Sequence, residues 1–118
     1  MKIKLTSVIV DNQDKALKFY TEVLGFVTKT EFPVGEFKWI TVILPEEPDG
    51  TELSLEPNEN PAAKTFQEAL YKQGIPLTTF VVDDIQKDFQ RMKELGVLFT
   101  KELTKRNGNR SHISRYLW

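Results

Sequence analysis

The sequence predicts an α+β domain made of two βαβββ modules that form a curved mixed sheet around a cavity, with the second module incomplete. Two observations lead to this prediction. The first is a repeat, because residues 10–26 and 82–97 each follow a β-branched run, open with Val-Asp and close on Leu-Gly plus an apolar residue. Copies about 70 residues apart are too widely spaced for a solenoid and indicate a duplicated half-domain. The second is the order of elements in the first half, strand, helix and then three strands.

Composition places the chain among soluble globular proteins. Its 118 residues are 40% hydrophobic and 28% charged, and none is cysteine. This length is enough for one domain with a core of its own. The absence of cysteine rules out a disulfide framework and fits a cytoplasmic setting, which we expect. Neither a bilayer-spanning apolar run nor a signal peptide is evident, so no membrane partner is expected.

Charge is distributed unevenly along the chain. The net charge is −1, yet the stretch from Val97 to Trp118 contains five basic residues and one acidic residue. Such an end could contact an anionic ligand or a nucleic acid. No aromatic interleaving or binding motif accompanies these charges, so a solvated hairpin is the favoured interpretation, and we predict no nucleic-acid partner.

The first module is expected over residues 1–57. A strand over residues 3–10 leads to a helix capped by Asp11 or Asn12 and ended by Gly25. The helix has apolar residues at helical spacing, namely Ala16, Leu17, Tyr20, Val23 and Leu24. Three strands follow, over residues 26–32, 37–44 and 51–56, separated by breaks at residues 33–36 and 45–50.

A linker over residues 58–76 and a second module over residues 77–118 complete the prediction. The linker helix begins at Asn60-Pro61 and ends at Gly74, with an apolar stripe of Phe66, Ala69 and Leu70. The second module begins with a strand over residues 78–82 and a helix whose start resembles a capping box of Asp83 and Gln86. The apolar stripe of this helix is Ile85, Phe89, Met92 and Leu95, and Gly96 closes it.

Only two strands fit after the second helix, over residues 97–103 and 112–117, with a polar turn between them. One strand is therefore missing. We expect a natural end that has been replaced or cut short, as a change of reading frame would do. The open edge should cost stability or be covered by a dimer partner, and a homodimer is the expected state.

The strand over residues 51–56 supplies the candidate catalytic residue. Glu52, Ser54 and Glu56 alternate with Leu53 and Leu55, so the polar trio shares one face of the sheet. We expect that face to meet the cavity, where Glu52 could act as a general base and Ser54 and Glu56 could contact a ligand. The alternative is a hydrogen-bonded or solvated strand carboxylate, which is the more common situation.

Five further residues are candidates for ligand binding. Trp39 and Thr41 share a face of the third strand, and Trp39 could stack on a flat ligand or serve as core. Ser7 and Thr79 occupy matching first strands, but neither has a basic partner in sequence that would make it a nucleophile. His112, the only histidine, could shuttle protons, although an exposed strand histidine is favoured.

These patterns resemble the vicinal oxygen chelate superfamily, the group of glyoxalase I, bleomycin-resistance proteins and extradiol dioxygenases. The resemblance covers residues 3 to about 104 and is most specific at residues 19–26 (FYTEVLGF), 52–57 (ELSLEP) and 79–84 (TFVVDD). It implies sheets curled around a cavity, usually completed in a dimer. In the metal enzymes of the family, His and Glu from the first and fourth strands of each module hold a divalent ion.

The resemblance also implies where metal ligands would lie in this chain. The two first-strand positions fall on Leu5 and about Leu77, which cannot bind a metal, and one fourth-strand position falls on Glu52, which could. The remaining position lies in the missing strand. Composition agrees independently, because one His and no Cys cannot supply the usual sets for Zn, Ni or Fe. We therefore predict no metal and no other cofactor.

The sequence leaves three functions open. The first is a metal-independent module that binds and sequesters an unknown small molecule. The second is an isomerase or lyase that uses Glu52 as acid or base on a small metabolite. The third is a degenerate paralogue without a ligand. Resemblance of fold does not choose among them.

Overall fold

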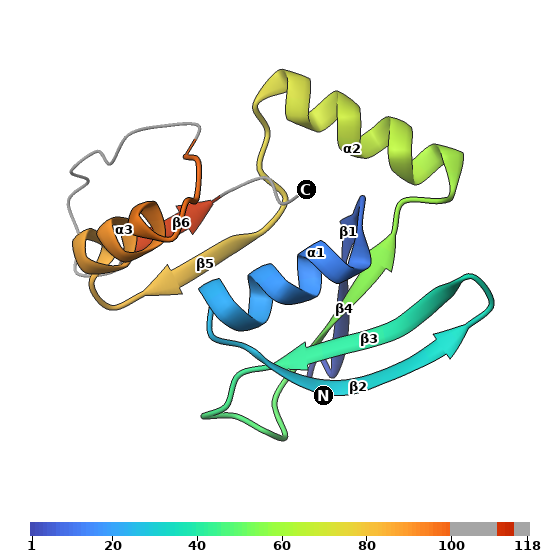
Figure 1. Ribbon diagram of the computed structural model, residues 1–118, viewed down its shortest axis with the longest axis horizontal. Coiled ribbons are helices and arrows are strands. Elements are labelled where there is room, and N and C mark those ends of the chain that lie inside the picture. Colours follow the sequence, from blue (N-terminus) through green and yellow to red (C-terminus); the bar gives the residue numbers. More distant parts are fainter. Residues whose placement is uncertain (100–110, 115–118) are drawn as a thin grey trace. The chain divides into compact units, whose positions relative to one another are not determined.

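The computed structural model describes residues 1–99 and 111–114. Their contacts divide the chain into two units, one formed by residues 1–70 and one that begins at Tyr71. Figure 1 labels the helices and strands of both.

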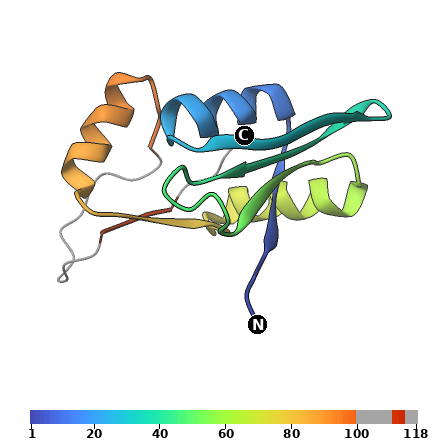
Figure 2. The same ribbon diagram turned by 90° about the horizontal axis from the view of Figure 1, so that it is seen from below.

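The first unit is a complete βαβββ module, as the sequence predicts. Its sheet has the order β1-β4-β3-β2. β1 and β4 are parallel, whereas β3 is antiparallel to both β4 and β2, so the sheet is mixed. The strands are β1 (Leu5–Val10), β2 (Val27–Val34), β3 (Phe37–Ile43) and β4 (Glu52–Pro57). The sheet is curved and does not close on itself (Figures 1 and 2), and the α+β class is confirmed.

Helix α1 (Gln13–Lys18) continues into a π-helical turn, η1 (Phe19–Val23). Asn12 caps α1, because its side-chain oxygen accepts from Lys15 N at 3.0 Å. Gly25 ends the segment with φ of 82°, a conformation that glycine adopts without steric cost. The cap and the terminator agree with the sequence prediction. The π turn was not predicted.

One face of the sheet packs against α1, and the core of the unit lies there. α1 contacts both β3 and β4, and Figure 2 shows it along one side of the sheet. The apolar residues with almost no exposed surface are Val10, Ala16, Tyr20, Ile40, Val42 and Leu55. Full burial of each large apolar side chain contributes roughly 1.5–3 kcal/mol to the stability of the fold. The packing of α1 on the sheet is therefore the main source of stability in this unit.

β2 extends two residues further than the sequence predicts, through Pro33 to Val34. It is the edge strand of the sheet. Proline has no N–H for a ladder hydrogen bond, but at an edge that group is not needed. The turn after it contains Gly35 with φ of 61°.

Helix α2 (Pro61–Gln73) begins as predicted, with the Asn60 side chain accepting from Ala62 N at 2.9 Å. Gly74, with φ of 72°, follows the helix. The expected burial of Phe66 is wrong, because half of its surface is exposed. Gln67 is buried instead; its amide donates to Ile9 O at 2.9 Å and accepts from Asn58 Nδ2 at 3.0 Å. The helix is therefore held to β1 by a hydrogen bond from Gln67, where an apolar contact by Phe66 was expected.

The second unit contains β5 (Thr79–Val82), α3 (Ile85–Glu94) and β6 (Ser111–Ser114). The residue that caps α3 is Asp84, whose side chain accepts from Lys87 N at 3.1 Å. The prediction of Asp83 is therefore wrong by one residue. Asp84 has the extended backbone that a cap requires, with φ of −129° and ψ of 96°.

The segment after α3 also differs from the prediction. Residues 97–99 are not part of a strand. Val97 is buried, and the ring of Phe99 packs against that of Phe89 with centroids 4.5 Å apart and a tilt of 42° between the ring planes. The rest of the expected strand, residues 100–103, and the turn at 105–110 lie outside the described residues. β6 overlaps the strand expected over residues 112–117, whose last three residues also lie outside.

The two units use their first strands differently. β1 pairs in parallel with β4, whereas β5 pairs antiparallel with β6. Within residues 1–99 and 111–114, the second unit therefore does not reproduce the βαβββ pattern; the incomplete second module stays a prediction, because residues 100–110 and 115–118 lie outside the described part. In this part of the chain no helix is both long and apolar enough to cross a bilayer.

Candidate functional site

The face of the β1–β4 sheet opposite α1 contains most of the predicted site residues. We call it the polar face, and its hydroxyl and carboxylate residues are Ser7, Thr30, Thr41, Glu52, Ser54 and Glu56. Register places them together: Thr41 pairs with both Thr30 and Ser54, and Ser54 pairs with Ser7. Side chains paired across neighbouring strands project from the same side of a sheet. The predicted alternation of Glu52, Ser54 and Glu56 with two leucines therefore holds.

A directed chain of hydrogen bonds crosses three strands on this face. Thr41 Oγ1 donates to Glu52 Oε1 at 2.9 Å. Thr30 and Thr41 hydroxyls are 2.5 Å apart, and because Thr41 has one proton, which goes to Glu52, Thr30 must be the donor of this second bond. Thr41 has no exposed surface. These two hydrogen bonds fix the position of one carboxylate oxygen of Glu52.

A second short contact lies beside this chain. Ser54 Oγ donates to Glu56 Oε1 at 2.8 Å, and Ser54 is 1% exposed. Glu52 and Glu56 are both half-buried. The polar face thus combines two carboxylates, each held by a buried hydroxyl, with the exposed Ser7 at the neighbouring edge.

Two aromatic side chains lie near the start of β3, on the N-terminal side of Thr41. Trp39 is half-buried and pairs with Phe32, which is 50% exposed. Trp39 is two residues from Thr41, so it projects from the polar face. The structure therefore brings Trp39, Thr41, Ser54 and Glu56 onto one surface, with Phe32 as an aromatic neighbour that sequence reasoning did not select.

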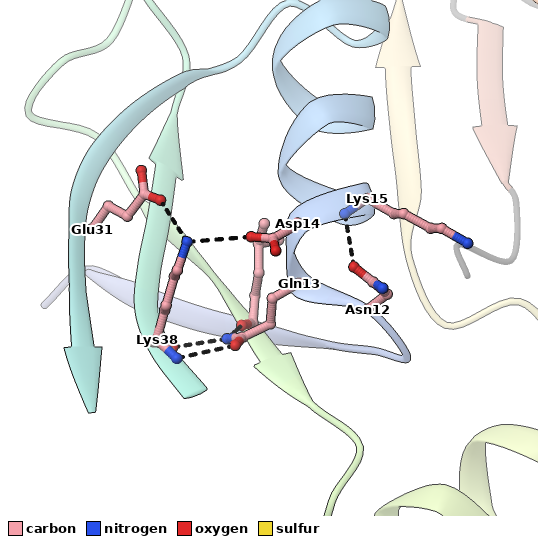
Figure 3. Close-up of polar contacts among 7 residues, drawn as sticks. Asn12, Gln13, Asp14, Lys15, Glu31 and Lys38 are labelled. Carbon is pink, nitrogen blue, oxygen red and sulfur yellow. Dashed lines mark hydrogen bonds and ion pairs between the residues drawn. The ribbon is translucent and has the colours of Figure 1, made fainter. Parts of the chain in front are cut away.

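Sequence reasoning also missed Thr30 and Gln13. Thr30 stands in an alternating strand, but nothing local indicates that its partner is Thr41. Gln13 extends from α1 to the gap between β3 and β4, where its amide bonds to the backbone of both strands (Figure 3). No periodicity or motif distinguishes this glutamine from a solvated one.

Lys38 lies on the face covered by α1, at the surface. Its ammonium contacts Asp14 Oδ1 at 3.3 Å and Glu31 Oε1 at 3.4 Å (Figure 3). Hydrogen bonding to Asp14, then to Glu31, raises the pKa of Lys38 above its ordinary value of 10.5. This pair of contacts joins α1, β2 and β3 at the surface, away from the polar face.

Thr79 and His112 belong to the second unit. Thr79 is exposed at the start of β5, and the backbone of His112 pairs with that of Val81. Their place in a common cavity with Ser7 stays a prediction.

The positions that hold a metal in the metal enzymes of the resembled family can be tested in the first unit. Leu5 pairs directly with Glu52 across β1 and β4. A leucine therefore stands where the second ligand would be needed. Within residues 1–99 and 111–114, no three His, Asp or Glu side chains gather closely enough to hold a metal ion. The residues of the first unit do not fit a metal of this kind.

A groove of about 660 Å³ lies elsewhere in the first unit, between residues 2–4 and residues 47–51. None of the predicted site residues lines it. Lys4 closes part of it by donating to Asp49 O at 3.4 Å.

Comparisons with known proteins agree with this architecture. Residues 2–113 match the family described as the Glyoxalase/Bleomycin resistance protein/Dioxygenase superfamily. The uncharacterized protein YurT of Bacillus subtilis (strain 168) is 56% identical over 105 residues, which cover 89% of this chain and 83% of YurT.

Solved structures show the same fold. UcmS2 aligns with a TM-score of 0.76 and 28% identity, covering 98% of this chain and 90% of its own. TnmS3, described as an antibiotic binding protein from Streptomyces sp. CB03234, aligns with a TM-score of 0.63 and 23% identity, covering 98% and 88%. A superfamily member from Sphaerobacter thermophilus DSM 20745 aligns with a TM-score of 0.59 and 22% identity, covering 97% and 96%.

Proposed function

Because this chain belongs to the Glyoxalase/Bleomycin resistance protein/Dioxygenase superfamily, we propose that it binds a small organic molecule on its polar face without a metal, and sequesters it. The observation that carries this proposal is the composition of that face. Buried hydroxyls and half-buried carboxylates stand beside an aromatic pair, Trp39 and Phe32, on one side of the sheet. Binding sites for small molecules combine apolar or aromatic surface with a few fixed polar groups in this way.

The proposed roles follow from the geometry. Trp39 stacks on a flat part of the ligand. The buried hydroxyls of Thr41 and Ser54 donate to Glu52 and Glu56, so the groups left to meet a ligand are the two half-buried carboxylates, which accept hydrogen bonds. The ligand should therefore donate hydrogen bonds to this face. Ser7 lies at the edge of this face. Ligand contacts by Thr79 and His112 stay predictions from the sequence.

We propose that binding needs no metal because the side chains at the family's metal positions cannot hold one. Leu5 beside Glu52 leaves a single carboxylate at the place where two ligands would be needed. One carboxylate holds a divalent ion weakly in water, because affinity depends on several ligands acting together. TnmS3, described as an antibiotic binding protein, shows that a protein with this fold can bind an antibiotic; for the present chain, binding is argued from the polar face itself.

The catalytic alternative required Glu52 in a closed, partly apolar pocket. Glu52 is half-buried, and one of its oxygens accepts from Thr41. This arrangement suits an acceptor held in a fixed position, so sequestration is the function we favour. The homodimer and the cytoplasmic setting stay predictions from the sequence.

A thermal-shift screen tests the proposal. The purified protein is heated with planar aromatic compounds and, separately, with bleomycin, first in EDTA and then with added divalent ions. A ligand at a hundred times its Kd should stabilise the fold by about 2.7 kcal/mol and raise the Tm by roughly 10 °C. The same shift is expected with and without EDTA. No shift with any compound, or shifts only after metal addition, would count against the proposal.

Two variants show whether a hit binds the polar face. Thr41→Val removes a buried hydroxyl that bridges Thr30 and Glu52, so we expect a loss of about 1–2 kcal/mol in stability and a smaller ligand-induced shift. Thr28→Val makes the same change at an exposed position of the same sheet, paired with Val42 on the face toward α1. It should leave the ligand-induced shift unchanged.

A further inference from the structure

β3 and β4 pair at only two positions, Thr41 with Ser54 and Val42 with Leu53. Beyond Thr41, β3 continues alongside β2 as far as Phe37, and β4 continues alongside β1 as far as Pro57. The sheet therefore forks at this end. Trp39 lies on one branch of the fork and Glu56 on the other, and both project from the polar face.

Continuing the register places a proline opposite Lys38. Lys38 would stand opposite Pro57, and proline has no N–H to donate to Lys38 O. The Lys38 N–H and C=O both face β4 rather than β2, because the amide that binds them also binds Leu55 O. At this register β4 therefore supplies no donor to the Lys38 carbonyl.

The side chain of Gln13 supplies the missing groups. Its Nε2 donates to Lys38 O at 2.7 Å and to Leu55 O at 2.9 Å, and its Oε1 accepts from Lys38 N at 3.1 Å. The amide thus acts as a short piece of strand inserted between β3 and β4 (Figure 3). A primary amide can do this because it offers two donors and an acceptor in one plane.

We propose that Gln13 is a positioning residue, which holds the ends of β3 and β4 apart at a fixed spacing and so sets the separation of Trp39 from Glu56 on the polar face. Its importance for ligand binding rests on the proposed function, but its effect on the fork does not. Gln13 reaches the fork from α1, on the far side of the sheet from Trp39, so it shapes the face without touching what binds there. If the amide is lost, the backbone groups of Lys38 and Leu55 must find water or each other, and the spacing is no longer fixed.

The experiment compares Gln13→Leu with Gln67→Leu. Gln67 is a matched control, because its amide also donates to a strand carbonyl, Ile9 O, but on β1. Two readouts need no ligand: hydrogen exchange of the Lys38 amide, and acrylamide quenching of Trp39 with Trp118→Phe as the background. In Gln13→Leu, Lys38 exchange should rise by about tenfold more than the change in global stability accounts for, and Trp39 quenching should change. Gln67→Leu should lower stability without these local effects.

A second variant keeps the test decisive if Gln13→Leu does not fold. Gln13→Glu keeps size and acceptor but replaces both donor contacts with a carboxylate facing two carbonyls. Protonation near pH 4 restores one O–H donor, so Trp39 quenching in Gln13→Glu should return toward the wild-type value as the pH falls from 7 to 4. The inference would be overturned if both Gln13 variants showed the same Trp39 quenching and the same Lys38 exchange as the wild type. It would also be overturned if Gln67→Leu changed these two quantities as much as the Gln13 variants do.

A ligand from the thermal-shift screen separates the two proposals. Unequal affinities of the wild type and Gln13→Glu at pH 7 support both. If the Gln13 variants alter Lys38 exchange and Trp39 quenching but the screen finds no ligand, the positioning of β3 and β4 by Gln13 is supported and the proposed binding function is not. Equal affinity for wild type and Gln13→Glu would overturn the positioning role while leaving the function in place.

Discussion

Single hydroxyls and amides decide the polar organisation of the first unit. Thr41 is placed so that its one proton reaches Glu52 while its lone pair accepts from Thr30. A valine at this position would fill almost the same volume and break both contacts. Buried polar chains of this kind favour one arrangement of the side chains because every alternative leaves a group without a partner.

Lys38 gives a pH-dependent prediction at the same scale. Hydrogen bonds to Asp14 and Glu31 raise its pKa, so the stability that it adds is present below its unfolded pKa and is lost as the pH rises through its folded pKa. Asp14→Asn removes the largest cause, and the titration midpoint of Lys38 should therefore fall. An NMR titration of the lysine side chains measures it.

Salt provides the control for this prediction. Lys38 and Asp14 side chains are exposed, and 1 M NaCl should screen their attraction and lower the wild-type midpoint in the same direction. A Lys38 midpoint that is equal in the wild type and in Asp14→Asn at low salt would contradict the assigned cause.

At the scale of elements, the sequence predicted most of what local rules govern. The first helix, its Asn12 cap, its Gly25 terminator and the three strands after it are present because caps, turn residues and periodicity are local signals. The π turn at residues 19–23 was not predicted, because no local signal distinguishes its i to i−5 hydrogen bond, from Leu24 N to Phe19 O at 3.1 Å, from an ordinary helical one. The fork at Gln13 depends on the register between β3 and β4 and on the approach of α1 to both strands, which no local pattern reveals.

The same distinction holds for the site. Alternation correctly placed Glu52, Ser54 and Glu56 on one face, because period two is a property of any strand. The partners Thr30 and Thr41 come from different strands, so their meeting is fixed by tertiary register. In the second unit, Asp83 and Asp84 are chemically equal as caps, and only the backbone conformation at residue 84 decides between them.

Helix caps give a prediction at this scale. Asn12→Ala removes the acceptor for Lys15 N and should lower the free energy of unfolding by about 1 kcal/mol. Urea unfolding followed by circular dichroism measures the change. Asn12→Asp keeps an acceptor and should retain most of the stability; an equal loss in both variants would show that the cap does not act through this hydrogen bond.

At the scale of the whole molecule, the two halves that resemble each other in sequence pair their first strands differently in the described residues. The first has a complete mixed sheet, in which β1 pairs in parallel with β4. In the second, β5 pairs antiparallel with β6. All residues of the polar face come from the first unit, so the ligand contacts proposed for that face lie in this half of the chain.

The most direct test is to map ligand contacts by amide and side-chain NMR shifts in EDTA, using the strongest compound from the thermal-shift screen. Metal-independent binding on the polar face predicts perturbations at Thr30, Trp39, Thr41 and Ser54, weakened in Thr41→Val and unchanged in Thr28→Val. Perturbations confined to the face covered by α1, or appearing only when a divalent ion is added, would contradict it.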